Sequence, residues 1–166
     1  MVKPDYLKVK ETVDRVLKEN MVVQPPISPE EIAENYGISI NPVIFSEKYK
    51  DVAGFFDFEE EKIFVNSEDP YNRRTFTIAH ELGHYFLHKK YFIENPKEYK
   101  VLHRMPIGAV NDDPLEKEAN AFAANLLVPK FLLSKYKDYA STDELAKLFS
   151  VSKDVIRNRQ KFEYGI

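Results

Sequence analysis

The sequence predicts an α+β fold that is mostly helical, with a small β-sheet packed on one central helix. Apolar residues recur every three to four positions over most of the chain, which is the spacing of amphipathic helices. Residues 38–45 and 54–66 are instead rich in β-branched and aromatic residues, which indicates strands. The longest helical stretch, residues 69–89, carries the pattern His-Glu-Leu-Gly-His between apolar flanks.

The N-terminal part of the chain is predicted to hold two helices and one strand. Residues 5–20 place one stripe of apolar side chains at helical spacing. Ser28 can cap a second helix, because Pro29 follows it at the first helical position, and Gly37 can end that helix. The branched residues of 38–45 then predict a strand.

The middle of the chain is predicted to hold a hairpin, the central helix and a long loop. Residues 54–66 indicate a β-hairpin, although its turn lacks the usual Asn-Gly pair. The central helix follows over residues 69–89. Residues 90–112 mix aromatic, basic and proline residues without a period, so we expect a long loop with room for one strand. A loop of this length inside a compact domain is usually functional.

The C-terminal part is predicted to be helical throughout. Asp113 caps a helix that Pro114 begins and Pro129 ends. Apolar spacing and capping residues predict three further short helices, over residues 131–136, 141–149 and 152–162.

Composition excludes several classes of protein. The 166 residues carry a net charge of −3, which gives the chain as a whole no attraction for polyanions such as nucleic acids. There is no cysteine, so disulfides and thiolate metal sites are excluded. Because the N-terminus is highly charged and no apolar run approaches about 20 residues, we expect a soluble, cytoplasmic protein that does not enter the membrane.

The His-Glu-Leu-Gly-His pattern predicts a metal-dependent hydrolase. On a helix, His80 and His84 lie one turn apart on the same side, where two imidazoles can hold one Zn²⁺ ion. Glu81 falls on the same side and can act as the acid and base toward a water molecule. Phe76, Leu82 and their apolar neighbours indicate that the helix is largely buried, where two histidines and a glutamate need polar partners.

A zinc hydrolase needs a third protein ligand, and three residues are candidates. His88 lies about 12 Å along the helix axis from His80, and no glycine bends the chain between them, so we interpret it as a hydrogen-bonded histidine. Glu116, at the edge of the apolar face of the helix over residues 113–128, is the favoured ligand. His103 in the long loop is the second choice.

Glu116 also has a purely structural interpretation. The sequence Asp113-Pro114-Leu115-Glu116 matches a capping box, in which Glu116 would bond back to the start of its own helix. We favour the ligand because the metal needs a carboxylate or a histidine and few are available. Asn120, one turn further along the same edge, can then orient a ligand.

Two segments of the chain together resemble the ImmA/IrrE metallopeptidases. These are Arg73–His84, and Glu116–Pro129, in which Val128 stands where the family usually has methionine. The resemblance covers most of the chain, from about Ser28 onward. It implies a minimal zincin-like, gluzincin-type metallopeptidase domain in which His80, His84 and Glu116 hold Zn²⁺ and Glu81 is the catalytic acid and base.

The resemblance also implies a biological role and a division of the chain. Such proteins often belong to bacterial, phage or mobile-element regulatory pairs and cleave a helix-turn-helix repressor, which would be the protein substrate here. We expect one domain over residues 1–166, with an N-terminal helix and linker at 1–27. The catalytic core would occupy residues 28–128, and helices resembling a helix-turn-helix would occupy 129–166.

The sequence is compatible with more than one interpretation at three points. A donor that stabilises the oxyanion could come from any of five residues, namely Tyr71, Arg73, Tyr85, His88 and His103. The hairpin over residues 54–66 can either present an edge strand to an extended substrate or be an ordinary part of the sheet. One alternative function is a zinc-binding regulator that does not cleave its partner. The other is a DNA-binding protein that uses Arg157, Arg159 and Lys161 to contact phosphates, and we favour DNA binding less than peptide cleavage.

Overall fold

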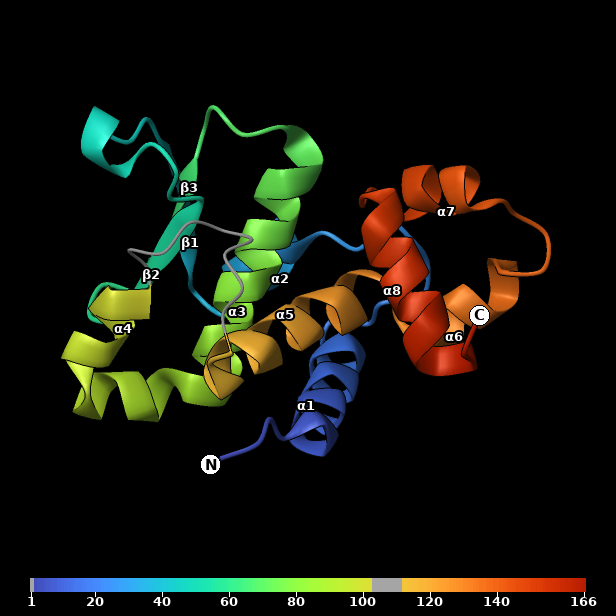
Figure 1. Cartoon of the computed structure of the whole chain (residues 1–166), viewed down its shortest axis with the longest axis horizontal. Coiled ribbons are helices and arrows are strands. Elements are labelled where there is room, and N and C mark those ends of the chain that lie inside the picture. The colour runs from blue at the N-terminus through green and yellow to red at the C-terminus, as the bar shows by residue number, and fades with distance from the viewer. Residues whose placement is uncertain (1, 103–111) are drawn as a thin grey trace.

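The computed structural model describes residues 2–102 and 112–166 and confirms the α+β class (Figure 1). The elements follow in the order α1 (Tyr6–Glu19), α2 (Pro29–Asn35), β1 (Ser39–Val43), the 3₁₀ helix η1 (Glu47–Tyr49), β2 (Gly54–Asp57), β3 (Lys62–Asn66), α3 (Tyr71–Glu94), α4 (Pro96–Leu102), α5 (Pro114–Leu127), α6 (Lys130–Tyr136), α7 (Thr142–Phe149) and α8 (Lys153–Tyr164). Within the described residues, no helix combines the length and the apolar character that crossing a bilayer requires.

The sheet has three strands in the order β1-β3-β2 and lies beside α3 (Figure 1). β1 runs parallel to β3, and β2 runs antiparallel to it, so the predicted hairpin is present. In this sheet β2 is an edge strand. Gly54 is needed at the start of β2, because a Cβ there would come within 2.8 Å of the Thr77 side chain of α3 and even closer to the Phe64 carbonyl oxygen.

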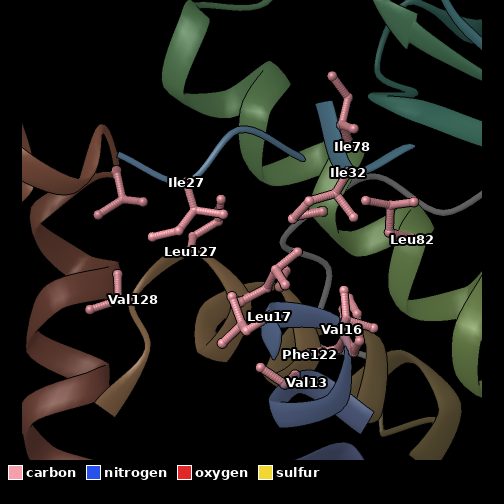
Figure 2. Close-up of a cluster of buried hydrophobic side chains, with 14 of the residues drawn as sticks. Val13, Val16, Leu17, Ile27, Ile32, Ile78, Leu82, Phe122, Leu127 and Val128 are labelled. Atoms are coloured by element: carbon pink, nitrogen blue, oxygen red, sulfur yellow. The ribbon is translucent and has the colours of Figure 1, made fainter. Parts of the chain in front are cut away.

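The central core lies between α1, α3 and α5 (Figure 2). Each helix turns its predicted apolar stripe inward, and the contributing side chains include Val13, Val16 and Leu17 of α1, Ile78 and Leu82 of α3, and Phe122 and Leu127 of α5. α3 and α5 pack closely at Gly83. A Cβ at Gly83 would lie 3.1 Å from both Ala119 Cα and Phe122 Cβ, so glycine allows the two helices to approach closely.

The long loop predicted over residues 90–112 is wrong for its first half. α3 continues to Glu94, five residues beyond the predicted end, and α4 follows directly. Phe92 is buried against the ring of His84, and Tyr99 of α4 packs on Phe92 and Phe58. These helical turns are stabilised by aromatic contacts with α3 and with the segment that follows β2. The sequence of residues 90–102 shows no regular helical spacing of apolar residues that would have predicted them. His103 lies outside the described residues.

The C-terminal helices α6, α7 and α8 lie together at the end of the molecule away from the sheet (Figure 1). Ser141 and Glu144 form a capping box at the start of α7, and Ser150 in the left-handed conformation ends that helix. In α8, Arg159 is only 2% exposed; it donates to the Val128 carbonyl oxygen and pairs with Glu163 at 2.9 Å. The expectation that Arg159 is available to DNA phosphates is therefore wrong, because its guanidinium fastens α8 to the end of α5.

Candidate metal centre

The structure brings His80 and His84 of α3 next to Glu116 of α5. Glu116 Oε2 lies 3.2 Å from His80 Nε2, and Glu116 Oε1 lies 2.9 Å from His84 Nε2. The two imidazole Nε2 atoms are 3.1 Å apart, and one ligand atom from each of the three residues lies within 4.8 Å of the others. The three side chains converge although 31 residues separate His84 from Glu116, because α3 and α5 pack together at Gly83.

The start of α5 directs Glu116 toward the histidines. The Asp113 side chain accepts the amides of Leu115 and Glu116, and Pro114 occupies the first turn. Asp113 therefore caps the helix, while both oxygens of Glu116 face imidazole nitrogens. The capping-box interpretation of Glu116 is wrong for this conformation.

The electrostatics of the three residues match a site for a cation. Burial would raise the pKa of Glu116, but the neighbouring imidazoles of His80 and His84 lower it far below its usual value. Burial would likewise lower the pKa of His80, yet the Glu116 carboxylate raises it above 6.5. Glu116 is thus held in its ionised form by its contacts with the two imidazoles.

The donor set fits a divalent metal ion. Two imidazole nitrogens and one carboxylate are ligands that such ions accept in proteins. Among the described residues, Glu116 Oε1 is buried and makes no hydrogen bond of regular geometry, although it lies 2.9 Å from His84 Nε2. A buried carboxylate oxygen in this state has a lone pair available for a metal ion.

In each histidine of the cluster Nε2 faces the other two residues, and Nδ1 contacts a neighbouring side chain. His80 Nδ1 lies 2.9 Å from Asn120 Oδ1 of α5. His84 Nδ1 lies 3.0 Å from His88 Nδ1, and His88 Nε2 lies 2.6 Å from Glu118 Oε2. His88 is therefore a hydrogen-bonded histidine beside the cluster, as predicted, and not a member of it.

Glu81 is buried next to the cluster and is bonded by a residue that the sequence did not indicate. The Tyr99 hydroxyl of α4 donates to Glu81 Oε2 at 3.2 Å and accepts the amide of Phe56 in β2. Burial, and next the charge of Glu81, raise the pKa of Tyr99 well above 10, so its hydroxyl keeps its proton at neutral pH.

Three of the residues considered as oxyanion donors, Tyr71, Arg73 and Tyr85, form no hydrogen bond or ion pair with the cluster among the residues that the structure describes. Arg73 pairs with Asp69 about 10 Å along the α3 axis from His80, and Tyr71 is exposed still further toward the start of that helix. The Tyr85 ring stacks on Phe56 beneath the sheet. Of this group, only His88 contacts a residue of the cluster in the described part of the chain.

Comparison with known proteins gives one family. The family model of the IrrE N-terminal-like domain, Peptidase_M78, matches residues 33–161. Among similar proteins, "Uncharacterized immunity region protein 2" of Bacillus phage phi105 is 30% identical over 149 residues, covering 88% of this chain and 85% of the relative. Metallopeptidase ImmA of Bacillus subtilis (strain 168) is 31% identical over 98 residues, covering 57% of this chain and 53% of the relative.

A solved structure has the same fold. The Mycobacterium tuberculosis transcriptional regulator aligns with a TM-score of 0.64 and 16% identity, over 93% of this chain but only 46% of that one. The family model covers most of this chain, including both helices that carry the His-His-Glu cluster. The chain therefore belongs to the IrrE N-terminal-like, or ImmA/IrrE, family of metallopeptidases.

Proposed function

We propose that this protein is a zinc-dependent endopeptidase that cleaves a helix-turn-helix transcriptional repressor in a bacterial, phage or mobile-element regulatory pair. The observation that carries the proposal is the convergence of His80, His84 and Glu116 beside the buried carboxylate of Glu81. The metallopeptidase family supports the reaction class, and the relative named for a phage immunity region supports the regulatory setting.

In the proposed reaction His80, His84 and Glu116 hold the Zn²⁺ ion. When bound, the ion supplies Lewis acidity, which polarises the scissile carbonyl and lowers the pKa of a water molecule. Glu81 accepts a proton from the water molecule while the oxygen of the water forms a bond to the carbonyl carbon. Glu81 then gives the proton to the leaving amine as the C–N bond breaks. Tyr99 fixes one oxygen of Glu81 by donating to it, and Asn120 fixes the ring of His80.

The test separates metal binding from cleavage. Glu81→Gln should keep the zinc content of the purified protein near one ion per chain but abolish cleavage of the repressor encoded beside the gene, because the amide cannot accept the proton. His80→Ala and Glu116→Ala should lose the zinc as well, as measured by elemental analysis after dialysis. If Glu81→Gln still cleaves the repressor, the proposed role of Glu81 is wrong.

Two further outcomes decide between the candidate functions. A wild-type protein that holds zinc and binds the repressor without cleaving it would make the chain a non-cleaving regulator. A wild-type protein that holds no zinc would refute the metal centre itself.

A further inference from the structure

A line of hydrogen bonds, buried at His84 and His88, runs from His84 to the start of α1. His84 Nδ1 contacts His88 Nδ1 at 3.0 Å, and His88 Nε2 contacts Glu118 Oε2 at 2.6 Å. The second oxygen of Glu118 accepts the backbone amide of Asp5 at 2.7 Å, the residue that caps α1. His88 is 4% exposed and Glu118 is 8% exposed, so water does not screen these contacts.

The carboxylate at the end of the line determines where the proton of His88 lies. An ionised carboxylate only accepts hydrogen bonds, so at 2.6 Å from Glu118 the His88 Nε2 atom must carry a proton. A neutral imidazole carries a single ring proton, and His88 Nδ1 is then an acceptor. The proton shared between His84 Nδ1 and His88 Nδ1 therefore belongs to His84.

The same assignment leaves His84 Nε2 without a proton, which is the state that binds a metal ion. In the reverse arrangement, His84 would carry its proton on Nε2, facing Glu116 and His80, and could not be a ligand. His88 Nε2 would also face the Glu118 carboxylate with a lone pair, which is repulsive. Only one arrangement of protons satisfies both the carboxylate and a metal ion.

We propose that His88 and Glu118 are positioning residues of the metal centre. His88 accepts the Nδ1 proton of His84 and fixes both the tautomer and the ring orientation of that ligand, and Glu118 fixes the tautomer of His88. The proposal rests on the proposed function in one respect, namely that His84 holds the ion through Nε2. A partner on the second nitrogen of a metal-binding histidine typically changes metal affinity by about 10- to 100-fold.

The test measures Zn²⁺ affinity by competition with a chromogenic chelator, which does not depend on peptide cleavage. His88→Leu fills the buried site with an apolar side chain and removes the acceptor, and we expect the Kd for Zn²⁺ to rise about 10-fold or more. His88→Asn places an amide oxygen near the position of Nδ1 and should recover part of the affinity. Glu118→Gln can satisfy only one of its two neighbouring donors and should weaken binding less than His88→Leu does.

Leu87→Ala is the matched control, because Leu87 is a buried neighbour of His88 on the same helix. It should lower the stability of the protein, as large-to-small core changes do, without changing the Kd for Zn²⁺. Two results would overturn the proposal: His88→Leu binding Zn²⁺ within about threefold of wild type, or Leu87→Ala losing as much affinity as His88→Leu.

A measurement on the unsubstituted protein tests the proposal even if His88→Leu does not fold. In the Zn²⁺-loaded protein, ¹⁵N NMR of the imidazole rings should show His84 protonated on Nδ1 and His88 protonated on Nε2. A His88 ring protonated on Nδ1 would refute the assignment. If wild type binds Zn²⁺ and depends on His88 but does not cleave the repressor, the proposed peptidase function fails while this inference holds.

Discussion

The close approach of α3 and α5 at Gly83 makes Gly83→Ala a sensitive test of how the metal centre is assembled. The new Cβ would lie 3.1 Å from Ala119 Cα and Phe122 Cβ and 3.2 Å from the Ala119 carbonyl oxygen. These distances are a few tenths of an ångström too short, and two of the three atoms belong to the backbone while the third, Phe122 Cβ, is bonded directly to it. The strain can therefore be relieved only if the two helices move apart.

The magnitude follows from two opposing contributions. Alanine is favoured over glycine inside a helix by about 1 kcal/mol, and overpacking a well-packed contact costs about 1–3 kcal/mol. We therefore expect the free energy of unfolding to fall by about 0–2 kcal/mol. Metal ligands tolerate displacements of about 0.2 Å, so moving Glu116 away from His80 and His84 should weaken Zn²⁺ binding by about 10-fold.

The assay is urea unfolding of the metal-free protein, together with chelator competition for Zn²⁺. Comparing Lys90→Gly with Lys90→Ala, at an exposed position of the same helix, measures the helix preference for alanine without the contact to α5. If Gly83→Ala gains the full preference measured at Lys90 and binds Zn²⁺ as tightly as wild type, the close approach does not position the ligands and the reasoning is refuted.

Three further predictions concern the other contacts. In metal-free protein, burial would lower the pKa of His80 but Glu116 raises it, and the pKa of Glu116 is lowered in turn, so this pair stabilises the fold fully only between about pH 4.5 and 6.5. The stabilisation falls as the pH rises past the raised pKa of His80; urea unfolding should show that loss, and Glu116→Gln should abolish it. Arg159→Met should lower the free energy of unfolding by about 3 kcal/mol by breaking a buried ion pair, whereas unchanged stability would contradict the buried role. Tyr99→Phe should speed hydrogen exchange of the Phe56 amide, measured by NMR, about fivefold, because one hydrogen bond contributes about 1 kcal/mol. An unchanged exchange rate would contradict the hydrogen bond from this amide to Tyr99.

The parts of the centre that depend on spacing within one helix could be predicted from the sequence. His80 and His84 are one turn apart whatever surrounds them, and Glu116 lies on the edge of the apolar face of α5 because leucine, alanine and phenylalanine define that face. The α+β class followed from the same local patterns and is confirmed.

The contacts that depend on packing could not be predicted. The distance from His88 to Glu118 is set by how far α5 is rotated about its axis, which the sequence does not specify. α4 was missed because a seven-residue helix has little stability of its own and is held here by Phe58 and Phe92 around Tyr99. Arg159 was misjudged because a basic residue on an amphipathic helix is usually exposed, and only the nearby carbonyl and carboxylate explain its burial.

The position of the Tyr99 hydroxyl has a consequence for how a peptide could reach Glu81. Phe56 lies opposite Ile63 in a strand whose other side is the edge of the sheet, and its amide donates to Tyr99. A peptide that joins β2 as a further strand would need that same amide for one of its own carbonyl oxygens. A groove of about 620 Å³ lies between β2 and the α3–α4 corner, and Tyr99 forms part of its wall. A peptide that pairs with the Phe56 amide therefore displaces the Tyr99 hydroxyl from it, so pairing at this position costs the hydrogen bond between α4 and the sheet.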